Sequence, residues 1–328
     1  MLFAHRVLWV VTTGVAFLCA VPASGQDPST GSGQAYPNKP IRVITSEAGG
    51  GNDFSAREIA RGISGPLGRP VTVENRQAGV VPGEIVSKAP PDGHTLLVYN
   101  NTVWIGPLLQ SASYDAVKDF APIVEAARTP NVLMVNSSSP ATSVAELIAL
   151  AKARPGALRY GVSGNGAANH MAGELFGAMA GIRIVHVVFK GAGASIKALL
   201  DDEMQLMFLI PVSAKALVKS GKMRALGVTS AAPSALMPGV PPVADSGLPG
   251  YESIVIFGAF APAATPRNVI DRLNSEIVRF LTRPEVKERL FNFGLEIDGG
   301  SPEQFFVTVR SELLRMGKVI KDAGIRVE

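Results

Sequence analysis

The sequence predicts an α/β fold, because short runs of β-branched and apolar residues alternate with helical patterns. Several of these runs are apolar throughout, which is typical of strands covered on both faces in a mainly parallel sheet. The chain has 328 residues, so two domains are expected rather than one. The predicted strands cover residues 41–45, 71–75, 95–99, 132–135, 184–189, 204–210, 224–229 and 253–260.

The predicted helices have recognisable ends. Ser143 and Glu146 form a capping-box pattern at the start of one helix, and Gly181 follows the last apolar residue of another. Two amphipathic helices are expected near the C-terminus. These helices separate the predicted strands, as the α/β interpretation requires.

The first 25 residues are predicted to be a signal peptide. Arg6 precedes an apolar run of about 14 residues, which is short for a membrane span. Ala23 and Gly25 satisfy the small-residue rule for cleavage after Gly25. Residues 26–35 then form a flexible lead-in, and the exported chain is expected to be soluble. A membrane anchor is the alternative.

Cys19 is the only cysteine, and it lies inside the predicted signal peptide. The mature chain is therefore expected to have neither a disulfide nor thiol chemistry. Phe17 and Leu18 precede Cys19, whereas a lipoprotein signal needs small residues there. Nucleic-acid binding is not expected either, because the net charge of +4 comes from scattered basic residues and only 6% of residues are aromatic.

Residues 49–51 are three consecutive glycines between a predicted strand and a predicted helix. In α/β proteins, ligands bind in such loops at the carboxyl ends of strands. Glycine lets a ligand approach the backbone, and the free N–H groups of a helix N-terminus bind anions without a lysine or arginine. Asn52 or Asp53 is expected to cap this helix. A tight turn without a ligand is the alternative.

Residues 163–166 repeat this arrangement, with a strand before them and a helix behind them. If the two loops belong to different domains, two helix N-termini can face one cleft. A small carboxylate held at both ends would suit such a cleft.

Other motifs match less well. Residues 164–169 lack the third glycine of a dinucleotide fingerprint, and residues 191–197 lack the Gly-Lys-Ser/Thr of a phosphate loop. Asn165 replaces a glycine of the nucleophile elbow, so a hydrolase stays a weak alternative. His170 and Glu174 share a helix face, but two ligands make no metal site, and His186 is expected to be a core residue.

The sequence also resembles the substrate-binding proteins of tripartite tricarboxylate transporters, also called the Bug family. The resemblance covers nearly all of residues 36–328. The segments that carry it include "YPNKPIRVI", "GGGND", "VTVENR", "APPDGHTLLV", "YGVSGNGAANHMAGELF", "FKGAGASIKALL" and "GKMRALGVTS". Their order and spacing, rather than any single motif, make the match specific.

This resemblance implies a periplasmic, two-domain binding protein of the type II (Venus-flytrap) class, with the ligand cleft between the domains. It implies a small carboxylate ligand, delivery to the membrane subunits of a tripartite transporter, no catalysis, no cofactor and no metal. A monomer is expected. Sensing through a membrane receptor is an alternative to import. Glutamate, citrate, linear dicarboxylates, nicotinate and terephthalate-like acids remain open as ligands.

The resemblance also implies which residues line the cleft, in part through backbone amides. The implied ligand-binding residues are Ala48, Gly49, Gly50, Asn52, Asp53, Asn100, Asn101, Thr102, Ser163, Asn165, Gly166, Asn169, His170, Lys190, Gly191 and Ala192. The chain is expected to cross between domains near residues 130–136 and 250–253. Domain one would then comprise residues 36–130 plus 253–328, and domain two residues 131–252.

Three departures from the family pattern bear on the ligand. Ala48 replaces the usual proline and follows Glu47, whose carboxylate would repel an anion unless it points away. Residues 77–84 replace a glycine-rich loop. Residues 209–211 stand where an aspartate often grips an amino group, which favours a non-amino acid with an apolar or aromatic body. Phe54, Trp104 and Phe189 are candidates to contact such a body.

Overall fold

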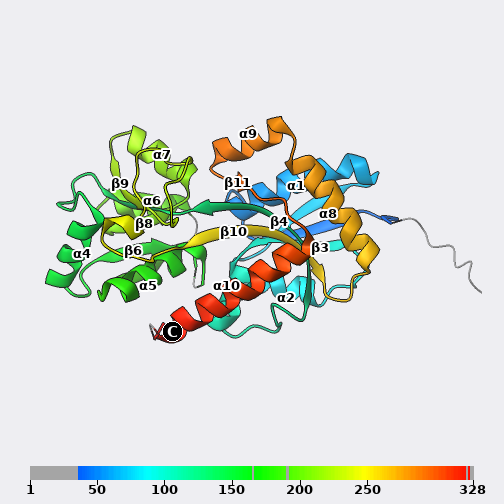
Figure 1. The fold of residues 1–328 in the computed structure, drawn as a ribbon, viewed down its shortest axis with the longest axis horizontal. Coiled ribbons are helices and arrows are strands. Elements are labelled where there is room, and N and C mark those ends of the chain that lie inside the picture. Colours follow the sequence, from blue (N-terminus) through cyan, green and yellow to red (C-terminus); the bar gives the residue numbers. More distant parts are fainter. Residues whose placement is uncertain (1–35, 165, 190–191, 323, 326–328) are drawn as a thin grey trace, which may run out of the picture. The chain divides into compact units, whose positions relative to one another are not determined.

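Two mixed β-sheets, each covered by helices, form the described part of the chain in a computed structural model (Figure 1). The structure describes residues 36–164, 166–189, 192–322 and 324–325. The predicted signal peptide, its cleavage site, Cys19 and the flexible lead-in lie outside the described residues. No helix in the described part is long and apolar enough to cross a lipid bilayer.

The first sheet has the strand order β11-β4-β10-β3-β1-β2. Its parallel half is β2-β1-β3, and β10, β4 and β11 add antiparallel pairs. The strands are β1 (Ile41–Thr45), β2 (Val71–Asn75), β3 (Thr95–Asn100), β4 (Phe120–Pro130), β10 (Ile254–Pro262) and β11 (Glu296–Ile297).

The second sheet has the strand order β7-β6-β8-β5-β9. Strands β7, β6 and β8 are parallel, whereas β5 runs antiparallel to both of its neighbours, β8 and β9. The strands are β5 (Val132–Asn136), β6 (Arg159–Val162), β7 (Val185–Val188), β8 (Leu206–Leu209) and β9 (Met223–Val228).

Helices cover both faces of each sheet, so four apolar clusters make up the core of the described residues. Helices α1 (Gly51–Leu67) and α8 (Arg267–Leu281) pack on one face of the first sheet, and α10 (Pro302–Asp322) packs on the other (Figure 1). The remaining helices are α2 (Val81–Ser87), α3 (Thr102–Ile105), η1 (Gly106–Leu108), α4 (Val144–Ala153), α5 (Ala168–Ala180), α6 (Ala192–Leu200), α7 (Pro211–Lys219), η2 (Ala244–Ser246) and α9 (Pro284–Phe293).

Two of the helix ends read from the sequence, the start of α4 and the end of α5, were correct, whereas three helices rather than two, α8, α9 and α10, lie near the C-terminus. Ser143 is the N-cap of α4 and accepts a hydrogen bond from the Glu146 amide, and Gly181 ends α5 with the left-handed conformation that glycine favours. The prediction of mainly parallel sheets was wrong. A strand covered on both faces is apolar whichever way it runs, so its composition does not report its direction.

The chain passes from the first sheet to the second at Asn131, between β4 and β5. It returns before β10. Thr229, which follows β9, joins these passages: its hydroxyl accepts the Asn131 N–H (2.7 Å) and donates to the Ser253 carbonyl (2.6 Å). All of Asn131, Thr229 and Ser253 are buried. The limits of the two domains stay a prediction.

Gly258 of β10 tests the packing between the first sheet and α10. A Cβ atom at Gly258 would lie 2.1 Å from a ring carbon of Phe305 and 3.1 Å from the Val124 carbonyl oxygen. Phe305 is itself buried, so its ring can move only by displacing other core side chains. Gly258→Ala should therefore destabilise the protein by roughly 1–3 kcal/mol, measured by chemical denaturation.

Gly317→Ala is the matched control, because a Cβ there has no heavy atom within 4 Å and the residue lies inside α10. That substitution should stabilise the protein by about 0.5–1 kcal/mol, since glycine is a poor helix former. Equal effects of the two substitutions would contradict the packing described here.

Candidate functional site

A cavity of about 520 Å³ lies between loops from the two sheets. The first sheet and its loops supply residues 46–52, Ala78, Gly79, Tyr99, Asn100, Thr102, Val255 and Phe257. The second sheet and its loops supply Ser163, Gly164, Ala167, Ala168, Asn169, Gly193, Ser195, Ser213 and the run from Met207 to Ile210. Asn131, at the crossing between the sheets, completes the lining.

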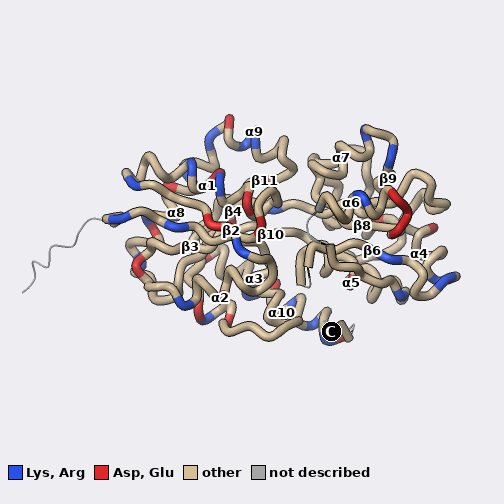
Figure 2. The backbone as a smooth tube through the Cα atoms, turned by 180° about the vertical axis from the view of Figure 1, so that it is seen from behind, with Lys and Arg blue, Asp and Glu red and all other residues tan. Residues whose placement is uncertain are grey.

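The described lining of the cavity carries almost no formal charge. Glu47 is the one charged side chain among its described lining residues. Lysine and arginine residues are spread along the described chain and alternate with acidic residues (Figure 2). Among the described lining residues, the donors available to an anion are backbone N–H groups and neutral polar side chains.

The N-terminus of α1 opens into the cavity. Gly50 is its N-cap residue, and no side chain caps this helix end. The first N–H groups of the helix therefore have no partner within the helix and are available to a ligand. The prediction that Asn52 or Asp53 caps α1 was wrong. Asn52 instead donates through Nδ2 to the Ser46 hydroxyl (3.0 Å).

Asp53 is buried beneath this loop rather than exposed in the cavity. Its carboxylate accepts hydrogen bonds from the Gly49 N–H (3.0 Å), from Arg57 (3.0 Å) and from Asn75 (2.8 Å). Gly49 has a φ of +87°, which favours glycine at this turn. Since its N–H is directed to Asp53, Gly49 lines the cavity without offering that N–H to a ligand.

The three polar residues at the end of β3, Asn100, Asn101 and Thr102, separate into two groups. Asn100 and Thr102 line the cavity, and the Asn100 side chain accepts the Thr102 N–H (3.1 Å). Asn101 does not line it; this side chain is buried and donates to the Ile254 carbonyl (3.0 Å). Asn101 therefore holds the end of β3 against β10.

The loop between β6 and α5 forms the opposite wall. Ser163 and Asn169 line the cavity, and the Asn169 side-chain oxygen accepts a hydrogen bond from the Ser163 hydroxyl (3.3 Å). Gly166 and His170 lie behind this wall. The His170 Nδ1 accepts the Gly166 N–H (3.0 Å), which fixes the loop to α5.

Three of the predicted site residues, Asn165, Lys190 and Gly191, lie outside the described residues. Ala192 is the first residue of α6. The same helix contributes Gly193 and Ser195 to the cavity lining. Helix α6 therefore borders the cavity.

Sequence reasoning missed most of the apolar wall of the cavity. Met207 and Phe208 come from the carboxyl end of β8, and Val255 and Phe257 come from β10. The rule that ligands bind at the carboxyl ends of strands could have indicated β8. It could not have indicated β10, which follows the return crossing and lies more than 100 residues from the cavity loops of the first sheet. Leu209 and Ile210, which replace an acidic residue of the family pattern, do line the cavity.

The aromatic residues that were singled out lie elsewhere. Phe54 stacks on Phe293 with ring centroids 3.6 Å apart, and Trp104 is fully buried in the core. Phe189 packs against the apolar cluster of the second sheet. The aromatic residues in the described lining are Tyr99, Phe208 and Phe257.

Glu47 and Tyr99 hold the neighbouring loop at the cavity edge. A Glu47 carboxylate oxygen accepts the Ala78 N–H (2.7 Å). The Tyr99 hydroxyl exchanges hydrogen bonds with the Gly79 N–H (3.1 Å) and carbonyl (3.2 Å). Burial raises the pKa of Tyr99, so this hydroxyl stays protonated and can donate. The Glu47 carboxylate is thus directed to a backbone donor, which reduces its repulsion of an anion.

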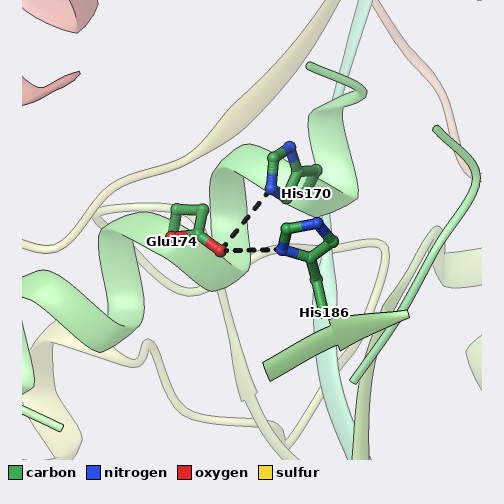
Figure 3. A group of neighbouring side chains, drawn as sticks. All are labelled: His170, Glu174 and His186. Atoms are coloured by element: carbon green, nitrogen blue, oxygen red, sulfur yellow. Dashed lines mark ion pairs between the residues drawn. The ribbon is translucent and has the colours of Figure 1, made fainter. Parts of the chain in front are cut away.

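Behind the second wall, His170 and Glu174 of α5 meet His186 of β7 (Figure 3). The His170 Nε2 and the His186 Nδ1 each lie 3.5 Å from Glu174 Oε1. Sequence spacing missed His186 as a third member. It is half-buried on a strand at the sheet edge rather than a core residue, because β7 has only one neighbouring strand.

The hydrogen bonds of His170 bear on whether this group can hold a metal. Because its Nδ1 accepts the Gly166 N–H, the neutral ring carries its proton on Nε2, the atom that faces Glu174. A metal-binding histidine needs a free lone pair toward the ion and donates from its other nitrogen. The arrangement of His170 is the reverse, so it suits interaction with a carboxylate.

Glu174 is negatively charged in this cluster. Burial by itself would raise the pKa of Glu174, but the two imidazoles and the Tyr160 hydroxyl, which donates to Oε1 (2.7 Å), outweigh burial and lower it. The cluster supports the cavity wall through His170 and does not line the cavity itself.

Comparison with known proteins shows the family. Residues 55–325 match the model of the tripartite tricarboxylate transporter family receptor, TctC. The chain is 35% identical over 291 residues to the UPF0065 protein in the tcbD-tcbE intergenic region of Pseudomonas sp. (strain P51), with 87% of each chain covered. The chain therefore belongs to this family of solute-binding receptors.

Solved structures agree with this assignment. The structure of R. palustris Rpa4515 with adipate has a TM-score of 0.82 and 34% identity, covering 89% of this chain and 99% of that one. MatC from Rhodopseudomonas palustris with bound malate has a TM-score of 0.80 and 25% identity, covering 87% and 100%. The fold is thus the two-domain fold of this family.

Asp53→Asn tests how the α1 loop is held. Both carboxylate oxygens of Asp53 accept hydrogen bonds, one from the Gly49 N–H and one from the Asn75 side chain. An asparagine at this position would direct its own NH₂ group toward one of these donors. Burial favours a raised pKa, but the partners Arg57, Asn75 and Gly49 outweigh it and lower the pKa of Asp53. The variant should lose roughly 1.5–3 kcal/mol of stability at neutral pH, the range for hydrogen bonds to a charged group.

This loss depends on pH in a defined direction. A carboxyl whose pKa is lowered by folding stabilises the protein above its unfolded pKa of about 3.9. That contribution disappears as the pH falls through the folded value. Denaturation at neutral pH and at low pH should show the two proteins converging in acid. Asp271→Asn, at an exposed ion pair with Arg267, is the control and should cost little. A gap that is constant with pH would contradict this account of Asp53.

Proposed function

We propose that this chain is a periplasmic solute-binding protein that captures a small carboxylate with an apolar body and delivers it to a tripartite tricarboxylate-type membrane transporter. The observation that carries the proposal is the cavity between the two sheets. Its described lining combines the uncapped N-terminus of α1, neutral polar side chains and an apolar wall, with no lysine or arginine.

The polar and apolar parts of the cavity suit different parts of one ligand. Backbone N–H groups at a helix N-terminus stabilise a carboxylate. Met207, Ile210 and Phe257 offer apolar contact to a hydrocarbon chain or ring. A linear or aromatic mono- or dicarboxylate fits this division better than an amino acid, whose ammonium group would need an acceptor; Glu47 is already bonded to the Ala78 amide. The relatives solved with adipate and malate support a carboxylate.

Catalysis is not part of the proposal. The described cavity lining contains no histidine, and its one carboxylate, Glu47, accepts a backbone N–H. Acid–base chemistry needs a titratable group within reach of the substrate. Binding and release through domain closure requires only contacts from both sides of the cleft, because those contacts form together in the closed state and favour it.

The carboxylate class is testable with a panel of acids. Adipate, malate, citrate, terephthalate, nicotinate and glutamate, each at millimolar excess, would be added to the purified protein and its thermal midpoint measured. A ligand at about 100 times its Kd stabilises the folded state by roughly 2.7 kcal/mol. That corresponds to several degrees at roughly 2–4 °C per kcal/mol. We expect dicarboxylates without an amino group, or aromatic acids, to raise the midpoint, and glutamate, which carries an ammonium group, to leave it unchanged.

A panel without any shift, on protein that has been unfolded and refolded to remove a retained ligand, would contradict the proposal. A shift by glutamate alone would contradict the preference for non-amino acids. Calorimetry with the acid that gives the largest shift would then provide its Kd.

Gly50→Val tests whether the ligand approaches the start of α1. Gly50 has φ −93° and ψ 177°, which valine adopts without strain, and a Cβ there has no heavy atom within 4 Å. Because Gly50 lines the cavity, the valine side chain would occupy open space at the cavity wall without disturbing the fold. Affinity for the bound acid should fall at least about tenfold, while stability without ligand stays within about 0.5 kcal/mol.

Gly317→Val is the control. Gly317 lies inside α10, with no heavy atom within 4 Å of an added Cβ, and it is not among the residues that line the cavity. Its affinity for the same acid should equal that of the wild type. Wild-type affinity in the Gly50 variant would remove the α1 loop from the binding site.

A further inference from the structure

Asn131 has an unused hydrogen-bond donor at the cavity. The residue is 2% exposed and lines the cavity at the crossing between the sheets. Its side-chain Nδ2 is buried and has no hydrogen-bond partner among the described residues. Buried donors are nearly always paired in folded proteins, because an unpaired one destabilises the fold. Because Asn131 lines the cavity, an acceptor on a ligand in the cavity is a candidate partner for this side-chain amide.

The backbone of Asn131 fixes the position of this side chain. Its N–H donates to the Thr229 hydroxyl (2.7 Å), and its carbonyl accepts the Thr229 N–H (2.9 Å). The Thr229 hydroxyl is in turn bonded to the Ser253 carbonyl. The side-chain amide therefore keeps its place at the cavity, and a half-turn of the amide group exchanges Nδ2 and Oδ1 without moving the chain.

We propose that Asn131 is a ligand-binding residue whose Nδ2 donates a hydrogen bond to an acceptor oxygen of the bound acid. The inference rests on the carboxylate-binding function proposed above. A neutral donor suits this cavity, since the described lining has no cation that would compete for the same oxygen. Asn131 was not among the site residues predicted from the sequence, because it lies between two strands rather than in a loop before a helix.

The contact would place the acid against the crossing of the chain as well as against the loops of each sheet. A ligand without an oxygen at this position would leave the donor unpaired, so Asn131 would also discriminate between acids. With this hydrogen bond in place, the side-chain Nδ2 of Asn131 would have a partner in the liganded protein.

Asn131→Leu separates this role from a structural one. If the donor has no partner in the empty protein, an apolar residue of similar size should leave the unliganded thermal midpoint unchanged or raise it. The Kd for adipate, measured by calorimetry, should nevertheless weaken about ten- to a hundredfold, the loss expected for a hydrogen bond to a charged acceptor. Asn131→Ala, which only removes atoms, gives a second reading if the leucine variant does not fold.

Asn274→Leu is the matched control. Asn274 of α8 does not line the cavity, and its Nδ2 donates to the Ile123 carbonyl (2.8 Å) and the Gly300 carbonyl (3.1 Å). The same substitution there should lower the midpoint and leave the Kd of the folded protein unchanged. The Asn131 variant should thus lose affinity and keep its thermal midpoint, whereas the Asn274 variant should lose thermal midpoint and keep its affinity.

The outcomes distinguish the two proposals. Wild-type adipate affinity in the Asn131 variants would overturn this inference and leave the carboxylate-binding function standing. A lowered midpoint with unchanged affinity would assign Asn131 a structural role, satisfied by water in the empty protein. If the wild type binds neither adipate nor any other acid of the panel, the proposed function fails and this inference fails with it.

Discussion

The hydroxyl of Thr229 joins the two halves of the described fold. It accepts the Asn131 N–H from the outgoing crossing and donates to the Ser253 carbonyl on the returning one. Because the group is buried, water cannot replace either partner, and the loss of one would leave the other unpaired. The cavity is bounded by loops from both sheets, so its dimensions depend on how these two crossings are held together.

The loops around the cavity are held from behind. Asp53 accepts the Gly49 N–H below the start of α1, Tyr99 holds Gly79, and His170 holds Gly166 through its backbone N–H. Because the described lining of the cavity holds no cation, its neutral donors depend on such support. A carboxylate that leaves water for this cavity needs donors that are already in position. Each helix end stabilises an anion only slightly and only within its first turn, and ordering the donors during binding would weaken the affinity.

Much of the fold and part of the cavity could be predicted from the sequence. The glycine run after β1 and the loop after β6 follow from one rule, that ligands bind at the carboxyl ends of strands in α/β proteins. Residues such as Gly50, Asn100 and Ser163 line the cavity for that reason. Asp53, Asn101 and His170 carry equally polar side chains next to these loops, Asp53 in α1 and His170 in α5, but their side chains are buried, and sequence patterns do not show which way a side chain points.

What could not be predicted depends on contacts between distant segments. Strand β4 contains Pro122 and the buried Glu125, which conceal it as a strand, and its pairing with β10 joins residues more than 100 positions apart. The same pairing brings Phe257 to the cavity, and the crossing that follows β4 brings Asn131. Thus local sequence predicts the loops of the site. The apolar wall and the position of Asn131 depend instead on the pairing of segments that are distant in the sequence. The selectivity of such a site depends on both, since the loops hold the charge and the distant segments set the space around the rest of the ligand.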